Sequence, residues 1–200
     1  KRHETNLRAL GAGKIFFLRH KASRDMPSGH TTSFSEALGF KPDFAIIANP
    51  TSLHMPVALR LAKAGIHLFI EKPLSWSENR VGELIRIAKD KKLVTMVGYN
   101  FRFHPQLIKI KKMVEAGTIG RILCGRVSAG QYLPDWHPGE DYKKGYAARR
   151  SLGGGVILTL IHEIDYLSWI MGEPQSVFCL ADKISKLAID VEDVAEILIK

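Results

Sequence analysis

Lys72 is the residue whose type and position in this sequence point most directly to chemistry. It lies in the run His-Leu-Phe-Ile-Glu-Lys-Pro at 67–73, which follows Gly65. A short apolar run closed by a proline is typical of a buried parallel strand, so we expect Glu71, Lys72 and Pro73 to mark its carboxyl end. A lysine there can hydrogen-bond a substrate hydroxyl and, when partly buried, act as an acid or base. The alternative is an ordinary Glu-Lys pair in a surface turn.

Two further predicted strands also end in polar or turn residues. The strand expected at 43–48 is followed by Asn-Pro-Thr at 49–51, and the strand at 93–97 by Gly-Tyr-Asn at 98–100. Ligands of open parallel sheets bind outside the carboxyl ends of the strands. We therefore expect the three strand ends to converge on one crevice that forms a ligand site.

A histidine later in the chain has a similar potential. The glycines at 153–155 are predicted to open a helix that runs to about Met171. At 100° per residue, the predicted core face carries Ile157, Leu160, Ile164, Leu167 and Met171, and the opposite face carries Leu158, Thr159, His162, Asp165, Tyr166 and Trp169. Taken alone, His162 fits a partnered structural histidine better than a catalytic one, but Asp165, one turn on, can orient its ring.

The elements that position these residues alternate along the first part of the chain. Helices are expected at 1–10, 33–39, 53–64, 77–89 and 105–116, and further strands at 14–19 and 66–70, with Ser77 as an N-cap. Alternation with short links predicts an α/β fold with an open, doubly wound parallel sheet. Because the chain opens on a helical remnant that stops at Gly11, we expect the first strand and its glycine turn to be missing.

The pattern changes after the turn at 117–120. Strands are predicted at 122–128, 175–181 and 194–199, around an aromatic-rich loop and the helix that carries His162. Such a run favours an open mixed or antiparallel sheet with helices on one face. We therefore predict a partial cofactor-binding Rossmann domain at 1–118 and a partial C-terminal α/β domain for substrate binding and oligomerisation at 119–200.

Composition excludes several classes of protein. The net charge of +9 is scattered along amphipathic segments and no nucleic-acid-binding motif accompanies it, so no nucleic-acid partner is expected. Cys124 and Cys179 stand far apart, which predicts neither a disulfide nor a metal site and is typical of a cytoplasmic protein. No apolar run is long enough to span a bilayer, and the start does not look like a signal peptide, so no membrane partner is expected.

The motifs taken together resemble the Gfo/Idh/MocA family of nicotinamide-dependent oxidoreductases. They are Asn-Pro-Thr at 49–51 with His54, Glu-Lys-Pro at 71–73, Gly-Tyr-Asn-Phe-Arg-Phe at 98–103, and the glycines at 153–155 followed by His162 and Asp165. The resemblance covers nearly the whole chain. It implies a Rossmann cofactor domain, a second α/β domain whose open sheet often forms oligomer contacts, and substrates that are sugars, cyclitols or their derivatives.

The resemblance also implies roles for individual residues. Lys72 would bind the reacting hydroxyl and His162 would be its acid–base partner, and the peptide bond between Lys72 and Pro73 would be cis. The expected substrate contacts are Lys72, Arg102, His162 and Asp165, and the expected cofactor contacts are Arg19, His20, Asn49, Thr51, His54, Glu71, Lys72 and Asn100.

The cofactor is expected to be NADP or NAD, with NADP slightly preferred. Cofactors that lack the 2′-phosphate usually meet an acidic residue after the second strand, whereas Arg19, His20 and Lys21 offer positive charge here. The alternative is a solvated basic turn.

Two departures from the family pattern affect these roles. The glycine-rich dinucleotide loop is absent, since Gly-Ala-Gly at 11–13 precedes a strand instead of a helix. Many members also carry an aspartate about one turn before the histidine, where this chain has Leu158 and Thr159. The carboxylate is then missing or supplied by Asp165.

The predicted function is hydride transfer between a nicotinamide cofactor and a secondary alcohol of a sugar, cyclitol or related substrate, in a protein that forms a homo-oligomer when complete. One alternative is a redox-assisted eliminase or glycosidase that oxidises and re-reduces a tightly held cofactor within each turnover. Another is a non-catalytic sensor that keeps the sugar and cofactor crevice, which the missing aspartate supports and the retained Lys72 and His162 oppose.

Overall fold

The computed structural model describes residues 2–20 and 27–200, so Lys21 of the predicted basic cluster lies outside the described residues. The chain divides into two compact units, Lys1–Ala45 and Ile46–Lys200. Each unit is described by itself below.

The first unit is small. Its elements are α1 (Arg2–Ala9), β1 (Phe17–Leu18), β2 (His30–Thr31) and α2 (Phe34–Gly39). The strands pair in parallel, with Phe17 opposite His30, so the strand predicted at 14–19 is present but shorter. Helix α2 begins where the sequence predicts, because the Ser33 side chain caps it by accepting a hydrogen bond from the Glu36 main-chain N–H.

A parallel sheet forms the framework of the candidate site. β3 (Phe44–Ile47) runs into the second unit, and the strand order is β3, β4 (His67–Ile70) and β5 (Thr95–Val97). Leu68 of β4 lies opposite Thr95 of β5 in parallel register. The parallel sheet predicted from the alternating pattern is therefore confirmed.

Helix α3 (His54–Lys63) supplies the core beside this sheet, where it packs on β4 and on α4 (Val81–Asp90). Its apolar residues Met55, Ala58, Leu59 and Ala62 follow the 3–4 spacing of one helix face, and each is at most 4% exposed. This buried face fixes α3 and, with it, the loop that precedes the helix.

The prediction for the start of α4 was wrong. The helix begins at Val81 and not near Ser77, because Arg80 adopts a left-handed conformation with φ of 63° that a helix cannot include. The Arg80 side chain instead reaches forward to Glu83, with Nε 2.8 Å from Oε2.

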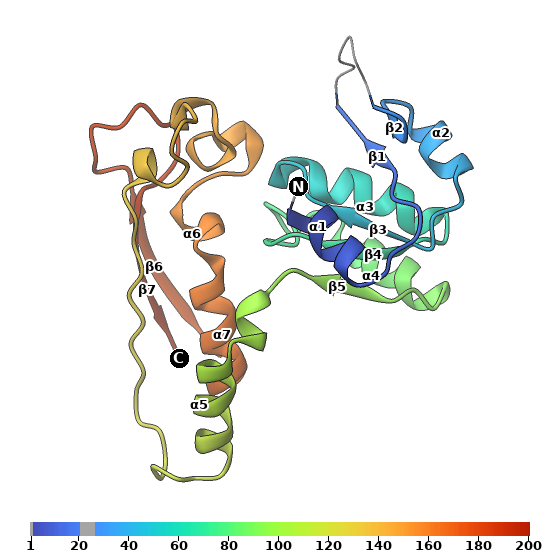
Figure 1. The fold of residues 1–200 in the computed structure, drawn as a ribbon. Coiled ribbons are helices and arrows are strands. Elements are labelled where there is room, and N and C mark those ends of the chain that lie inside the picture. The colour runs from blue at the N-terminus through green and yellow to red at the C-terminus, as the bar shows by residue number, and fades with distance from the viewer. Residues whose placement is uncertain (1, 21–26) are drawn as a thin grey trace. The chain divides into compact units, whose positions relative to one another are not determined.

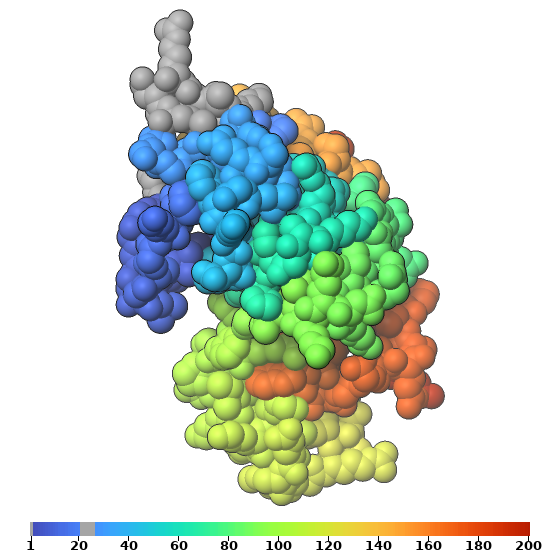
Figure 2. Space-filling view, turned by 90° about the vertical axis from the view of Figure 1, so that its right-hand side faces the viewer, coloured from blue at the N-terminus to red at the C-terminus, as the bar shows by residue number. Residues whose placement is uncertain are grey.

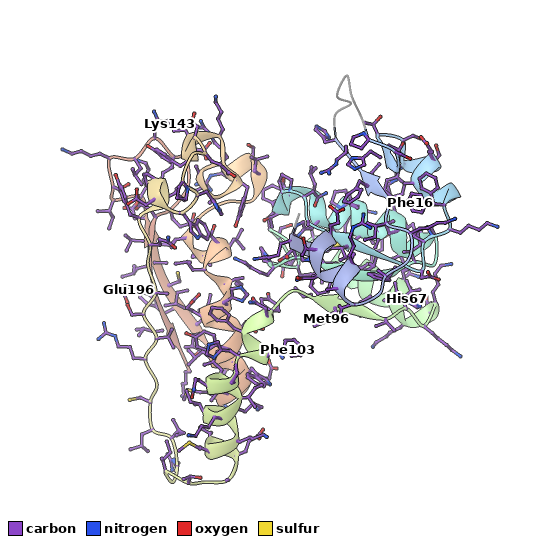
Figure 3. All side chains as sticks on the ribbon, in the orientation of Figure 1. Phe16, His67, Met96, Phe103, Lys143 and Glu196 are labelled. Carbon is purple, nitrogen blue, oxygen red and sulfur yellow. The ribbon has the colours of Figure 1, made fainter. Side chains whose placement is uncertain are left out.

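The remainder of the second unit contains a helical pair and a hairpin. Its elements are α5 (Pro105–Glu115), α6 (Val156–Thr159), α7 (Ile161–Met171), β6 (Val177–Asp182) and β7 (Val194–Ile199). Strands β6 and β7 are antiparallel, as predicted, and α7 runs alongside them (Figure 1). Glu196 of β7 is exposed and points away from α7 (Figure 3). In Figure 2 the yellow-green surface of α5 lies directly against the orange surface of α7.

Short 3-10 helices connect these elements. They are η1 (Thr51–Leu53), η2 (Asn100–Phe103), η3 (Leu133–Asp135), η4 (Tyr142–Lys144), η5 (Tyr146–Ala148) and η6 (Arg150–Leu152). No helix within the described ranges is both long and apolar enough to cross a membrane.

Three predictions for this part were wrong. Residues 122–128 alternate like a strand but pair with no strand among the described residues. The helix after the glycines is not continuous, because Leu160, with φ of −98° and ψ of 33°, separates α6 from α7. The predicted core face is not buried either: no residue of α7 is fully buried, and Met171 is 45% exposed.

Candidate active site

The three predicted strand ends do lie together, and His54 joins two of them. Its ring is 1% exposed, with Nδ1 2.8 Å from the Pro73 carbonyl oxygen and Nε2 3.0 Å from the Asn49 carbonyl oxygen. The third end joins through the Gly98 N–H, which donates to the Ile70 carbonyl. Both nitrogens of His54 face main-chain carbonyl oxygens, and the nitrogen that carries the proton donates a hydrogen bond to one of them.

Glycine at position 98 lets the ends of β4 and β5 approach closely. A Cβ at this position would lie 3.1 Å from Oε2 of Glu71 and 3.4 Å from Cζ of Phe69. Any larger residue would push the Glu71 side chain aside. Since Glu71 immediately precedes Lys72, the glycine helps fix where the lysine leaves the strand.

The Lys72 side chain is anchored where the chain breaks between α6 and α7. Its Nζ donates a hydrogen bond of 2.6 Å to the Thr159 carbonyl. In an unbroken helix that carbonyl would accept from the N–H of Glu163, but here the Glu163 N–H turns to Leu160. The break at Leu160 thus frees a main-chain acceptor for Lys72. The Lys72–Pro73 peptide is cis, as expected from the family resemblance.

The glycine run brings the loop before α6 close to η1. Gly153 has a φ of 77°, and a Cβ on it would lie 2.9 Å from Cβ of Thr51. A Cβ on Gly154 would lie 2.6 Å from the Ala147 carbonyl oxygen. Side chains at these positions would force the segments apart, and Thr51, which is 2% exposed, is buried beneath them.

His162 sits among aromatic rings. It stacks on Phe101, with ring centroids 4.5 Å apart and an interplanar angle of 15°, and meets the edge of Tyr99 at 6.1 Å. Its Nδ1 is buried, and within the described part of the chain no hydrogen bond reaches it. Most buried polar atoms in proteins have a hydrogen-bond partner, so this nitrogen is open to a hydrogen bond from water or a ligand.

Burial and neighbouring charges shift the pKa values of both Lys72 and His162. Burial lowers the pKa of Lys72, and the charges of Glu71 and Glu163 counter part of that effect. Burial also lowers the pKa of His162, the positive charge of Lys72 lowers it further, and Asp165 and Glu71 oppose the change. Nearby, burial and the charge of Glu71 raise the pKa of Tyr146. The arrangement favours a neutral imidazole beside a half-buried amine at neutral pH.

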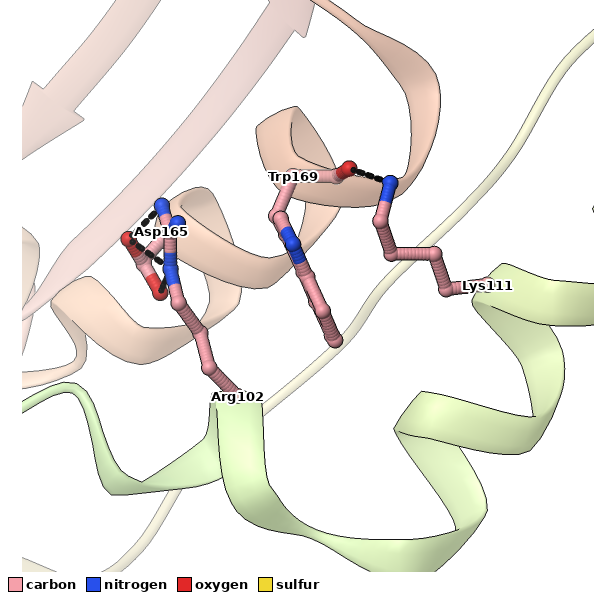
Figure 4. A network of polar contacts seen from close by, with 4 residues as sticks. All are labelled: Arg102, Lys111, Asp165 and Trp169. Atoms are coloured by element: carbon pink, nitrogen blue, oxygen red, sulfur yellow. Dashed lines mark hydrogen bonds and ion pairs between the residues drawn. The ribbon is translucent and has the colours of Figure 1, made fainter. Parts of the chain in front are cut away.

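Asp165 does not orient His162 by a hydrogen bond. Its carboxylate receives two short bonds from Arg102, 3.0 Å from Nε to Oδ2 and 2.8 Å from NH2 to Oδ1, and its side chain is 7% exposed. The Arg102 guanidinium lies 5.8 Å from the Trp169 ring, and Lys111, which donates to the Trp169 carbonyl, lies 5.2 Å from it (Figure 4). The network joins η2 and α5 to α7, and the hydrogen bond to Asp165 raises the pKa of Arg102.

The remaining predicted site residues differ in their surroundings. Asn49 keeps a buried Oδ1 for which the described residues provide no partner, while Asn100 is exposed. In the first unit, Arg19 donates from Nε to Nδ1 of His30 at 3.3 Å, and His20 is exposed. No group of three or more His, Cys, Asp or Glu in ranges 2–20 and 27–200 is arranged to hold a metal ion.

Sequence reasoning missed several contributors. The Thr159 carbonyl, Glu163 and Tyr146 were not singled out, and Tyr99 and Phe101 were noted only as part of a motif. The aromatic residues directly after a strand end were the signal available for the last two. The sequence marks Thr159 only as a departure from the aspartate of many family members, and the role of its carbonyl depends on a helix break without glycine or proline.

A cavity of about 350 Å³ lies on another side of Thr159. Its walls include Tyr132, Trp136, Leu187 and Val191, so it is mostly apolar. The buried Thr159 hydroxyl has no hydrogen-bond partner in the described ranges. Thr159 thus accepts a hydrogen bond from Lys72 through its carbonyl and also lines this cavity.

A parallel sheet with polar residues at the carboxyl ends of its strands is typical of the Rossmann class of folds, which bind dinucleotides at that edge. Two family models match the chain: "Oxidoreductase family, NAD-binding Rossmann fold" at residues 16–99 and "GFO/IDH/MocA C-terminal domain" at residues 107–200. The chain belongs to the Gfo/Idh/MocA family.

Individual relatives agree with this assignment. Levoglucosan dehydrogenase of Pseudarthrobacter phenanthrenivorans is 34% identical over 80% of this chain and 41% of its own length. Inositol 2-dehydrogenase of Rhizobium meliloti is 32% identical over 78% of this chain and 46% of its own length. A solved levoglucosan dehydrogenase complex with NADH and levoglucosan is 30% identical, with a TM-score of 0.70 over 86% of this chain and 48% of that chain.

A relative with a different reaction also matches. The 2,7-anhydro-N-acetylneuraminate hydratase of Mediterraneibacter gnavus is 29% identical over 64% of this chain and 33% of its own length. The chain thus spans about half the length, or less, of the relatives it matches.

Proposed function

We propose that the protein carrying this chain is an NAD(P)-dependent dehydrogenase that oxidises a secondary alcohol of a sugar, cyclitol or related compound, with Lys72 and His162 as catalytic residues. The observation that carries the proposal is the pairing of a half-buried lysine, fixed on the Thr159 carbonyl, with a histidine whose buried Nδ1 has no partner in the described ranges. The named activities of the levoglucosan and inositol dehydrogenases support the substrate class.

The residues divide the chemistry between them. An alcohol can lose hydride from its carbon only as its hydroxyl proton is removed, so the site needs a proton acceptor. Because burial and Lys72 lower its pKa, His162 is neutral at neutral pH and can take that proton. The ammonium group of Lys72 stabilises the negative charge that develops on the oxygen. The nicotinamide group, when bound, supplies the hydride acceptor.

The residues at the strand ends fit such a cofactor. The unpartnered Oδ1 of Asn49 is a buried acceptor at the edge where dinucleotides bind in this fold class. Glu71, Lys72, Thr51 and Asn100 complete the proposed cofactor contacts, and His54 holds the two loops that carry them. The description of the matching Rossmann model as NAD-binding supports NAD(H).

A preference for NADP is the finer part of the cofactor proposal. It depends on Arg19 and His20, which are exposed basic residues of the first unit. Dissociation constants of the full-length protein for NADP and NAD test it directly. Tighter binding of NAD would show that the basic residues have no role in cofactor choice.

Arg102 and Asp165 are proposed to contact substrate as a pair. Each carboxylate oxygen can accept more than one hydrogen bond, so Asp165 can hold a substrate hydroxyl while it keeps Arg102. Its charge also raises the pKa of His162 against the effect of burial. The pair therefore influences the proton acceptor without a hydrogen bond to its ring.

The test is a search for substrate-dependent change in cofactor absorbance with the full-length protein and a panel of anhydrosugars and cyclitols. Oxidation should increase with pH as His162 loses its proton. Because the pKa of His162 is lowered, the rate should increase at a lower pH than the one at which an ordinary histidine titrates. A protein that binds the cofactor and the sugars without turning them over would support the sensor alternative.

A redox-assisted elimination or hydration is the second candidate, and the hydratase relative favours it. In this reaction the substrate would first reduce the bound cofactor and later re-oxidise it within the same turnover. Substrate would disappear without net change in cofactor absorbance. Product analysis by mass spectrometry separates the two reactions.

The proposal includes self-association and a cytoplasmic location. The hairpin offers an apolar surface for self-association, since Phe178, Leu180 and Leu198 are each at least 58% exposed. The two cysteines are free and exposed, which fits a reducing compartment. Light scattering of the full-length protein measures the oligomeric state, and a monomer at assay concentrations would contradict the first part.

A further inference from the structure

Phe101 contacts the proposed proton acceptor, although the proposed chemistry gives it no role. It lies in η2, just after β5, and its ring stacks on that of His162 with centroids 4.5 Å apart and an interplanar angle of 15°. The phenyl ring therefore covers one face of the imidazole, and a tilt of the imidazole out of its present plane would break this contact. Tyr99 is farther away, at 6.1 Å, and nearly perpendicular, at 78°.

A hydrogen bond does not hold the buried nitrogen of His162 within ranges 2–20 and 27–200. In many acid–base sites a carboxylate or carbonyl accepts a hydrogen bond from one ring nitrogen and thereby orients the ring, which leaves the other nitrogen for the reacting group. Among the residues of those ranges, Nδ1 of His162 has no partner. Asp165, the carboxylate about one turn away, accepts bonds of 2.8 and 3.0 Å from Arg102 instead (Figure 4). The stacked ring of Phe101 is thus the closest support that the structure gives the imidazole.

Phe101 is itself tied to the helix that carries His162. Its ring also lies against Tyr166, with centroids 6.1 Å apart and an interplanar angle of 30°. His162 and Tyr166 are four residues apart on α7 and therefore share one face of the helix. Arg102, the next residue of η2, is bonded to Asp165 of the same helix. Both contacts keep the phenyl ring in place against α7.

We propose that Phe101 is a positioning residue for His162 and that its ring holds the imidazole in the plane from which it accepts the proton of the substrate hydroxyl. The inference rests on the proposed function for the role of His162 in the reaction. Proton transfer requires the acceptor nitrogen to lie within hydrogen-bond reach of the hydroxyl, and a small displacement from the productive geometry lowers the rate strongly. Phe101 acts through His162 and transfers no proton itself.

The competing explanation is that Phe101 only packs η2 against α7. Both explanations predict some loss of stability when the ring is removed, so stability does not separate them. A packing role changes the fraction of folded protein and leaves kcat per folded molecule unchanged. A positioning role lowers kcat, and it does so only while the imidazole is present.

The first experiment measures kcat and KM of the full-length protein with the most active member of the panel of anhydrosugars and cyclitols. Phe101→Leu keeps an apolar side chain but removes the flat ring, so kcat should fall by about tenfold to a hundredfold, while the KM for the cofactor should change by less than about threefold. Phe101→Tyr retains the ring and should keep kcat within a few-fold of the parent.

Phe103→Leu is the matched control. Phe103 belongs to the same 3-10 helix, but its side chain is 64% exposed (Figure 3), so this variant should leave kcat unchanged. If Phe101→Leu does not fold, Phe101→Met provides a second variant without a ring. Parental kcat in a folded variant without the ring would overturn the inference while the proposed function stands.

The second experiment tests whether Phe101 acts through His162. In the His162→Ala background no imidazole remains to be positioned, so the addition of Phe101→Leu should lower the residual kcat no further. A further loss by the same factor as in the parent would overturn the inference, because Phe101 would then act on the reaction by another route.

Nuclear magnetic resonance of the His162 ring gives a reading that needs no turnover, with the signal assigned by its absence in His162→Ala. A stacked phenyl ring shifts the imidazole protons upfield, and this shift should be lost in Phe101→Leu and kept in Phe101→Tyr. An unchanged shift in Phe101→Leu would overturn the inference. The expected shifts in a protein that oxidises no sugar or cyclitol would support the placement of the ring and contradict the proposed function.

Discussion

The candidate site has a strand side, formed by the ends of β3, β4 and β5, and a helix side, formed by α6 and α7. Each side carries a histidine, and the two histidines differ in their hydrogen bonds. His54, on the strand side, has both nitrogens on carbonyl oxygens and is 1% exposed. His162, on the helix side, has a buried Nδ1 without a partner in the described part of the chain. Among residues 2–20 and 27–200, Thr159 and Glu163 near His162 also have buried atoms without hydrogen-bond partners, and so does Asn49 on the strand side. His54 holds the framework through the main chain, whereas the buried nitrogen of His162 is open to a hydrogen bond from water or a ligand.

The largest effect on activity should come from replacing Lys72 or His162. Lys72→Met and His162→Ala, each in the full-length enzyme, should reduce kcat by about 10²- to 10⁴-fold, as expected for loss of an acid–base group. Cofactor affinity, measured by fluorescence titration, should change little. If either variant kept activity within a few-fold of the parent, that residue would return to a structural role.

Removing the strand-side histidine should instead affect folding. His54→Ala removes the donor of one of the Asn49 and Pro73 carbonyls and creates a cavity, so the free energy of unfolding should fall by about 3–5 kcal/mol. Denaturant unfolding measures this. His137→Ala, at an exposed ring that stacks on Trp136, is the control and should cost much less. A loss below about 1 kcal/mol for His54→Ala would remove the contrast between the two histidines.

A smaller effect should follow from Thr159→Val, which replaces the unpartnered hydroxyl by a methyl group of similar size. Since no hydrogen bond is lost, the free energy of unfolding should stay the same or increase by about 1 kcal/mol. Thermal unfolding without ligand is the measurement. A clear destabilisation would show that the Thr159 hydroxyl makes a hydrogen bond, and it would contradict its description as unpartnered.

The smallest effect concerns a pair of helices outside the site. Glu83 accepts from Arg80 and also pairs with Lys63 at 2.9 Å, and the hydrogen bonds from Arg80 and Lys63 lower its pKa to about 2. A depressed carboxyl pKa stabilises the fold above the ordinary glutamate value, and this contribution is lost as the pH falls toward about 2. Glu83→Gln should therefore be slightly less stable at neutral pH, with the difference vanishing in acid. A difference that persists at pH 2 would contradict this.

The two sides also differ in what could be predicted from the sequence. On the strand side, apolar runs and the turn residues after them are local signals, and the positions of β3, β4 and β5 were predicted to within a few residues. On the helix side, the break at Leu160 has no glycine or proline to announce it, and it arises from packing. Residues 122–128 have the alternation of a strand, but pairing depends on a partner that periodicity does not reveal.

The roles of individual residues were likewise predictable where they depend on local sequence and not where they depend on distant contacts. Lys72 was identified from its place after a strand, and its attachment to Thr159 was not, because the two are 87 residues apart in sequence. Asp165 was expected to serve His162 because they share a helix face. The guanidinium of Arg102, from a distant segment, forms two short bonds with it instead, which spacing along one helix cannot predict.

The two cations beside Trp169 make its indole ring an optical reporter. Arg102 and Lys111 lie within 6 Å of the ring and come from η2 and α5, so any shift of α7 changes the electric field across the indole. The emission wavelength of an indole follows that field. Trp76 and Trp136 are the other tryptophans of this chain, and with both replaced by phenylalanine the emission of Trp169 would report ligand binding near α7 even when no turnover takes place.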